Sequence, residues 1–270
     1  MHELATIARH AGTVLAGQLA IMAFGVTDTI VAGRYSADAL AALSVASALF
    51  VSVYVSLMGV LQALLPIWAE QHGRGETAAI GASFRQSLYL ALGFTLLGMV
   101  ILVFPDPILN WTEVPESMQG DVRTYLIIVG WALPSAMFFR LYTTLNQALG
   151  RPQLVTWLQV GALVLKVPLS IWFTFGGWGL EPQGAAGCAW ATLLVDYAIA
   201  IVAIVLMRYQ KLYAPLQLWQ RMEAPDFRRL AAFLRLGVPA GLSILVEVTS
   251  FTLVALFVAR QGALSAASHQ

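Results

Sequence analysis

One aspartate lies in the middle of a stretch that is otherwise typical of a membrane-buried helix. The stretch is "FGVTDTIVAG" (residues 24–33), the aspartate is Asp28, and the only other strongly polar side chain between residues 11 and 33 is Gln18. An ionised carboxylate at the centre of a bilayer helix costs about 2.5–3.5 kcal/mol even on a lenient insertion scale. In a low-dielectric cavity a carboxylate can exchange a proton near neutral pH, or bind Na⁺ together with neighbouring hydroxyls. Asp28 is therefore a candidate ion-coupling residue, and a hydrogen bond that only fixes helix packing is the alternative.

Two other apolar runs carry polar side chains at a matching depth. At a rise of about 1.5 Å per residue, Ser170 and Thr192 fall at the depth of Asp28, and Lys166 and Asp196 fall nearer the middle of the membrane. Lys166 with Ser170, and Thr192 with Asp196, are four residues apart, so each pair shares one helix face. The spacing predicts an outer layer above a central layer, with Lys166 paired to Asp196 in a structural role. A proton relay and direct coupling of Lys166 to Asp28 remain the alternatives.

The composition is that of a chain embedded in a lipid bilayer. Hydrophobic residues make up 59% of the 270 residues, charged residues 11%, and the mean hydropathy is +0.76. A soluble domain carries roughly 25% charged residues, so this chain could not cover a water-facing surface. The net charge of +1, without a basic stripe, argues against a nucleic-acid partner. The single cysteine, Cys188, excludes an internal disulfide and is interpreted as a small packing residue.

Seven apolar runs are each long enough to cross the hydrocarbon layer, which takes about 20 residues. They lie near 11–33, 42–67, 83–104, 123–147, 154–176, 186–207 and 231–259. Residues 1–207 are expected to form a six-helix transmembrane lobe, 208–230 a cytoplasmic amphipathic linker, and 231–270 the seventh helix of a truncated second lobe. With a cytoplasmic N-terminus, most of the 15 Lys and Arg residues fall on the inner side. The charges thus predict a multi-pass protein of a bacterial-type inner (plasma) membrane.

The first and seventh spans resemble each other at an offset of 224 residues. Val14, Ala16 and Gly17 match Val238, Ala240 and Gly241, and further identities follow downstream: Ala39, Leu40, Ala42 and Ser44 match Ala263, Leu264, Ala266 and Ser268. Both copies would run in the same direction, as in transporters built from two parallel halves with the site between them. The chain would then end one span into the second half.

Three stretches resemble the MATE (multidrug and toxic compound extrusion) transporters. "GVTDTIVAGRYSADALAALSVA" is similar to the first helix and following loop of that family, "KVPLSIWFTFG" with "GAAGCAWAT" to the fifth and sixth helices, and "LGVPAGLSILVEVTSF" to the seventh. The resemblance covers the whole chain, which would supply about the first seven of the family's twelve helices. It implies two six-helix lobes, alternating access, and export of small organic cations in exchange for H⁺ or Na⁺. The chain would then need no cofactor and would not be an enzyme.

The resemblance also implies roles for individual residues. Asp28 matches the first-helix aspartate of the family's cation site, and Glu247 matches a seventh-helix glutamate that faces the cavity between the lobes. Lys166 stands where the family usually has asparagine, and Ser170 where some branches have a further carboxylate. An ammonium near Asp28 would weaken a Na⁺ site, so H⁺ is favoured as the coupling ion, with Na⁺ at Asp28 as the alternative. No other metal site is indicated.

Other polar residues and other functions remain to be weighed. Gln18 and Gln62 either line the cavity, where they would bind substrate with Glu247, or bridge helices; a residue of the second half is the alternative partner of Glu247. No glycine-rich phosphate loop is present, so ATP hydrolysis within this chain is not the energy source. One rival function is a flippase for lipid-linked oligosaccharides, which would need a strongly cationic cavity. The other is a structural fragment that does not transport.

Overall fold

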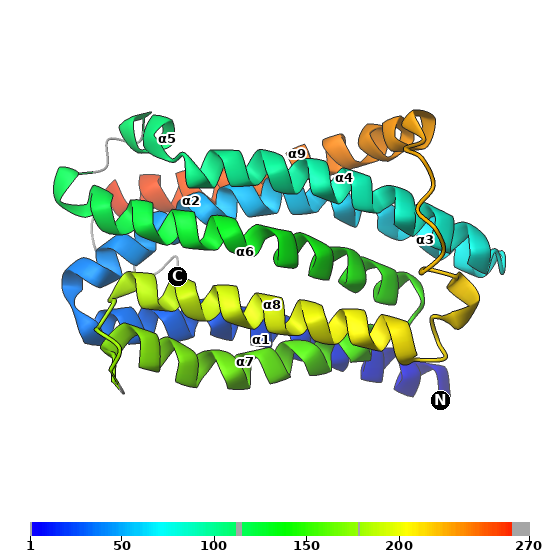
Figure 1. The fold of residues 1–270 in the computed structure, drawn as a ribbon, viewed down its shortest axis with the longest axis horizontal. Coiled ribbons are helices and arrows are strands. Elements are labelled where there is room, and N and C mark those ends of the chain that lie inside the picture. The colour runs from blue at the N-terminus through cyan, green and yellow to red at the C-terminus, as the bar shows by residue number, and fades with distance from the viewer. Residues whose placement is uncertain (1, 112–114, 178, 261–270) are drawn as a thin grey trace.

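The computed structural model describes residues 2–111, 115–177 and 179–260, and these residues form a bundle of long α-helices (Figure 1). The seven long helices are α1 (His2–Tyr35), α2 (Ala37–Gln62), α4 (Thr77–Val103), α6 (Glu116–Ala148), α7 (Pro152–Phe175), α8 (Ala185–Tyr209) and α9 (Phe227–Arg260). The short elements are α3 (Leu64–Gly73), α5 (Asp106–Trp111) and the 3₁₀ turn η1 (Ala214–Leu216). The expected all-α fold is confirmed.

Helix α6 is the central helix of the bundle. It packs against α8 on one side and against α2 and α4 on the other, and it is the most buried of the membrane-spanning helices. Helices α1 and α8 both pack against α7, while α9 packs mainly against α2 (Figure 1). Helices α1 and α9 run in the same direction along the bundle, as expected for parallel copies. The group α1–α7–α8 and the group α2–α4–α9 thus lie on two sides of α6, and they also meet directly where α1 packs against α2.

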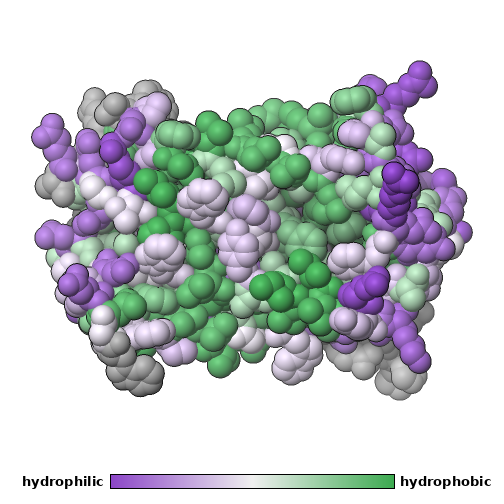
Figure 2. All heavy atoms as spheres, in the orientation of Figure 1, coloured by the Kyte–Doolittle hydropathy of each residue, from purple (hydrophilic) through white to green (hydrophobic). Residues whose placement is uncertain are grey.

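The surface supports a membrane location. Six helices of the described part are long and apolar enough to cross a bilayer, from Leu15–Tyr35 through Ala185–Tyr209. Figure 2 shows mainly hydrophobic residues across the middle of the visible face and hydrophilic residues gathered at its two ends. Large apolar side chains such as Met22, Leu96 and Ile201 are exposed in the middle of their helices, which is favourable against lipid. Helix α9 occupies the seventh expected span.

Two expected boundaries differ from the structure, and prolines account for one of them. The second span, expected at 42–67, is broken at Ala63 into α2 and α3, and α3 continues through Gly73 into the expected link. Pro66 lacks the N–H that would bond to the carbonyl of Gln62, and it is tolerated in the first turn of a new helix. The segment between the expected spans 83–104 and 123–147 contains α5 and the start of α6, where Glu116 suits the positive end of the helix dipole.

The segment expected to be an amphipathic linker contains no long helix of its own. Between the end of α8 and the start of α9, residues 210–226 (called the linker below) form only η1 and irregular structure. The arginine-rich stretch from residue 227 onward instead opens α9. Asp226 caps this helix, because its Oδ1 accepts hydrogen bonds from the backbone N–H groups of Arg228 (3.0 Å) and Arg229 (3.2 Å).

Candidate functional site

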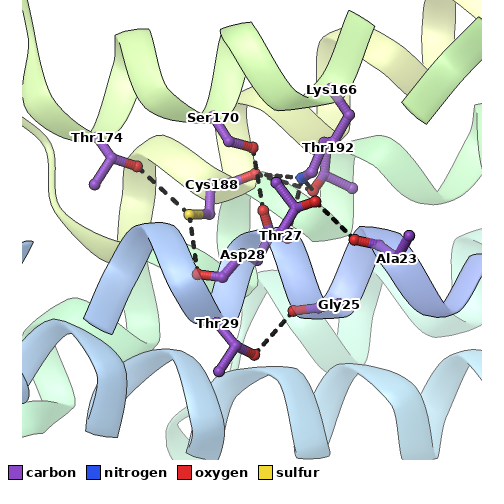
Figure 3. Close-up of polar contacts among 10 residues, drawn as sticks. All are labelled: Ala23, Gly25, Thr27, Asp28, Thr29, Lys166, Ser170, Thr174, Cys188 and Thr192. Atoms are coloured by element: carbon purple, nitrogen blue, oxygen red, sulfur yellow. Dashed lines mark hydrogen bonds and ion pairs between the residues drawn. The ribbon is translucent and has the colours of Figure 1, made fainter. Parts of the chain in front are cut away.

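Helices α1, α7 and α8 meet around a buried carboxylate. Asp28 of α1 is only 8% exposed, and Lys166 and Ser170 of α7 are fully buried beside it. The Lys166 Nζ lies 3.0 Å from Asp28 Oδ2, and the Ser170 hydroxyl donates to Asp28 Oδ1 over 3.1 Å. Both carboxylate oxygens are thus engaged by the same face of α7, as Figure 3 shows.

Helix α8 completes the site with one side chain and one main-chain oxygen. The Lys166 ammonium donates to the Cys188 carbonyl over 3.0 Å and also to the Thr192 hydroxyl. Thr192 in turn donates to the same Cys188 carbonyl over 2.9 Å. The Cys188 thiol lies 3.9 Å from the main-chain oxygen of Asp28 and 3.5 Å from the hydroxyl of Thr174. These bonds tie the three helices together (Figure 3).

Small residues let α8 approach α7 closely enough for these contacts. A Cβ atom added at Gly187 would lie 2.5 Å from the main chain of Phe173 and Thr174, so only glycine fits there. The adjacent Cys188 is therefore pressed against α7, and its carbonyl comes within reach of Lys166. Between Lys166 and Ser170, Pro168 lacks the N–H that a helix needs at that position, so the ladder of α7 is interrupted beside the site.

The pairing expected for Lys166 is wrong. Its ion pair is with Asp28, and Asp196 is not within ion-pair distance of it. Equal depth of two Cα atoms does not fix where a side chain of four methylenes ends, because such a chain can extend along its helix. Lys166 reaches toward Ser170, one turn away, and brings its ammonium to the layer of Asp28. Asp196 is half-buried on α8, one turn beyond Thr192.

The remaining predicted residues lie apart from this cluster. Gln18 is exposed on α1, and Gln62 accepts a hydrogen bond from the Arg140 guanidinium at the end of α2. Glu247 belongs to α9, and its side chain lies outside the described residues. The structure thus brings together Asp28, Ser170, Thr192 and Lys166. It leaves Gln18 and Gln62 elsewhere.

A second polar cluster was not predicted from the sequence. Arg85 of α4 is buried, donates to the Gln217 carbonyl over 2.7 Å, and pairs with Glu223 Oε1 at 2.6 Å. Gln86 donates to the Ala224 carbonyl over 3.0 Å. The Tyr89 hydroxyl donates to the main-chain carbonyl of Glu223, and the side-chain oxygen of Gln86 accepts a bond from the backbone N–H of Asp226, each over 2.8 Å. The signal for this cluster was the run "SFRQS" (83–87), which is unusually polar for an apolar helix.

Comparison with known proteins places this chain in a family. The sequence model of the MatE family matches residues 14–172, which is more than half of the chain. The chain belongs to the MatE family. It is 37% identical over 261 residues to a probable multidrug resistance protein NorM of Aromatoleum aromaticum, and 28% identical over 269 residues to the multidrug resistance protein PmpM of Pseudomonas aeruginosa. These alignments cover 97% and 99% of this chain and 56% of each relative, so this MatE chain spans little more than half of their length.

Solved MATE structures share the fold of this chain. A MATE crystal structure in a straight conformation superposes with a TM-score of 0.83 at 18% identity, over 97% of this chain and 57% of that one. The transporter VcmN of Vibrio cholerae, in a bent form, gives a TM-score of 0.75 at 20% identity, over 96% and 57%. The MatE fold is therefore present across the described helices.

Proposed function

We propose that this chain carries the ion-coupling lobe of a secondary antiporter that exports small organic cations across a bacterial inner membrane. An inward flow of H⁺, or alternatively Na⁺, would drive export by alternating access between two lobes. Membership of the MatE family supports this proposal, as do relatives whose names record multidrug resistance. The N-terminus would be cytoplasmic, so that Asp28 lies in the outer half of the membrane.

The observation that carries the proposal is the buried carboxylate of Asp28. Its neighbours Ser170 and Lys166 come from α7, and Lys166 is held by α8. A packing role alone would be met by hydroxyl groups, without the cost of burying a charge in a membrane helix. A group whose charge can be neutralised or exchanged between three helices can change how those helices pack, which is what coupling requires.

The remaining predicted residues would serve substrate binding and cation coupling. Glu247 and Gln18 would contact the organic cation, with Glu247 supplying the negative charge, whereas Gln62, bonded to Arg140, would bridge α2 and α6. Asp196, half-buried on α8 one turn from Thr192, would be a further carboxylate of the coupling site. The second lobe would be supplied by a further part of the protein or by a partner.

The burial of Lys166 argues against the flippase alternative. A flippase for lipid-linked oligosaccharides must offer cationic groups to the phosphates of its substrate. Lys166 is fully buried and donates to three oxygens of its own protein, so its ammonium is not presented to a cavity. A structural fragment that does not transport is the remaining alternative, and the assay below tests it.

Dye efflux from proteoliposomes tests the proposal. Efflux of a cationic dye is measured under an imposed H⁺ or Na⁺ gradient, for the chain alone and for the chain joined to the remaining portion of the Aromatoleum relative. Asp28→Asn should abolish gradient-driven efflux when wild type and variant are compared at equal amounts of reconstituted, folded protein. Asp38→Asn, the same substitution at an exposed acid in the first turn of α2, is the control and should transport normally.

The possible results separate the alternatives. Efflux by the joined protein that is lost with Asp28→Asn supports the proposal. Undiminished efflux with Asp28→Asn overturns the coupling role of Asp28. If neither the chain alone nor the joined protein transports although both are folded, the interpretation as a structural fragment that does not transport replaces the proposal.

A further inference from the structure

The chain has two lysines, and their surroundings are opposite. Lys211 is exposed in the linker, whereas Lys166 is fully buried in the middle of a membrane-spanning helix. A buried lysine is stable only when its ammonium is paired and hydrogen-bonded. The contacts of Lys166 therefore show which groups stabilise a positive charge at this position.

The three donors of a lysine ammonium find three acceptors. The Lys166 Nζ lies 3.0 Å from Asp28 Oδ2 and 3.0 Å from the Cys188 carbonyl oxygen, and it also donates to Thr192 Oγ1. An ammonium has three N–H donors and no acceptor. The Thr192 hydroxyl donates its own proton to the Cys188 carbonyl, so in its bond with Lys166 it can only be the acceptor. Every bond direction thus fits a charged ammonium beside a charged carboxylate.

The same oxygens are those that a small hard cation would use. Carboxylate, carbonyl and hydroxyl oxygens are the ligands that such ions prefer, and backbone carbonyls beside helix interruptions bind Na⁺ in transporters. Here they are supplied by Asp28, Cys188, Thr192 and Ser170. The ammonium of Lys166 already holds three of these four groups, so an added ion would find the position filled.

Electrostatics opposes a second cation in this position. Two unit charges about 4 Å apart at an effective dielectric constant of about 20 repel each other enough to weaken binding by about a thousandfold. Only one carboxylate of the cluster, that of Asp28, offsets them. Asp196, the next acid along α8, is beyond ion-pair distance of Lys166.

We propose that the Lys166 ammonium is the resident cation of the Asp28 site and keeps Na⁺ out of it. Lys166 is then the residue that sets ion specificity: the site of the natural chain does not bind Na⁺, and removal of the lysine opens it to Na⁺. In transport this means that efflux is not driven by Na⁺, a consequence that rests on the coupling role proposed for Asp28. The binding statement itself depends only on the geometry of the cluster.

Thermal unfolding of the purified chain in detergent tests the proposal. NaCl is raised from about 1 mM to about 100 mM, with choline chloride holding the ionic strength constant. The Tm of the wild type should not respond to Na⁺. The Tm of Lys166→Asn should rise by about 3 °C once Na⁺ reaches about ten times its Kd. Asp28→Asn added to Lys166→Asn should remove this response, and Lys211→Asn, at the exposed lysine, should behave as the wild type.

Each outcome decides the matter. A Na⁺ response of the wild type that Asp28→Asn removes would overturn the proposal, as would a folded Lys166→Asn without any response. Should Lys166→Asn not fold, Lys166→Ser carries the same measurement, and the wild-type series remains decisive by itself. The thermal assay measures Na⁺ binding and not transport. Its result therefore stands even if the efflux assay shows that Asp28 has no coupling role.

Discussion

The pair Asp28–Lys166 and the pair Arg85–Glu223 lie in opposite halves of the bundle and are built in different ways. In the first, both side chains are buried, with exposed fractions of 12% and 0%. In the second, Arg85 is buried but the Glu223 side chain is 47% exposed. Each cation also holds one main-chain carbonyl, but Lys166 holds that of Cys188 inside the long helix α8, whereas Arg85 holds that of Gln217 in the linker.

This difference indicates different tasks. Side chains can change rotamers, so the partners of Asp28 can rearrange while the helices stay in place. A main-chain carbonyl moves only with its segment, so the bonds of Arg85 and Gln86 fasten the linker to α4. Helix α9 begins where this fastened linker ends, at Asp226. Any movement of α9 relative to the other helices must therefore begin within or after its first turn, unless the linker detaches.

The largest effect is expected from breaking the first pair. Lys166→Ala or Asp28→Ala alone should lower the free energy of unfolding by about 3–5 kcal/mol, because each leaves an uncompensated buried charge. The double variant should regain most of this loss, and Asp196→Ala, the matched control, should have a much smaller effect. Denaturant unfolding in detergent, analysed as a double-mutant cycle, measures the coupling.

The cycle also identifies the partner of Lys166. Strictly additive losses for Asp28→Ala and Lys166→Ala would show that these two residues do not interact in the folded protein. Recovery in Lys166→Ala with Asp196→Ala, but not with Asp28→Ala, would restore the pairing expected from depth alone.

The second effect concerns the linker. Arg85→Met keeps the apolar stem but removes the bonds to Gln217 and Glu223, which should weaken docking of the linker by about 1.5–3 kcal/mol. Glu223→Gln should cost at most about 1 kcal/mol, because Glu223 is half-exposed and its pairing is weakened by solvent. The rate of trypsin cleavage after the exposed Arg221 reports docking. Equal acceleration by both substitutions would show that the ion pair, and not the carbonyl contact, fastens the linker.

Much of the fold follows from the sequence, because each long apolar run needs a helix to satisfy its backbone within a membrane. The break at Ala63 was missed, although the Pro66 that causes it is visible in the sequence. Helix α9 was expected, but its start in the arginine-rich stretch was not, because charged residues there suggested a surface element.

The site was predictable only in part. The depths of Asp28, Ser170 and Thr192 in their helices placed them in one layer, and they lie around one cluster. The pairing favoured for Lys166, with Asp196, was wrong because the long side chain ends away from the depth of its own Cα, and Asp28, its partner in the structure, had been only an alternative. The Cys188 carbonyl could not be found from residue types, since every residue has a carbonyl and only the close approach at Gly187 selects this one.

The smallest effect is expected from removing a neutral hydrogen bond of the linker, in contrast to the charged contacts of Arg85. The hydroxyl of Tyr213, a buried linker residue, donates to Asn146 Oδ1 over 2.7 Å, and Asn146 is oriented by its own bond to the Tyr142 carbonyl. Tyr213→Phe should therefore cost about 0.5–1.5 kcal/mol of unfolding free energy at neutral pH. The loss is measured by denaturant unfolding, and Tyr209→Phe, at an 80% exposed tyrosine at the end of α8, is the control.

The pH dependence of this difference has a definite sign. Burial raises the pKa of Tyr213 above its ordinary value of 10.0, because the phenolate would be desolvated. The folded state then holds its proton more tightly than the unfolded chain does, so the contribution of Tyr213 is fully present below about pH 10 and is lost as the pH rises through the folded-state pKa. The stability difference between wild type and Tyr213→Phe should thus be constant at neutral pH and shrink in alkali. A difference that stays constant in alkali would mean that the Tyr213 hydroxyl is not buried against α6.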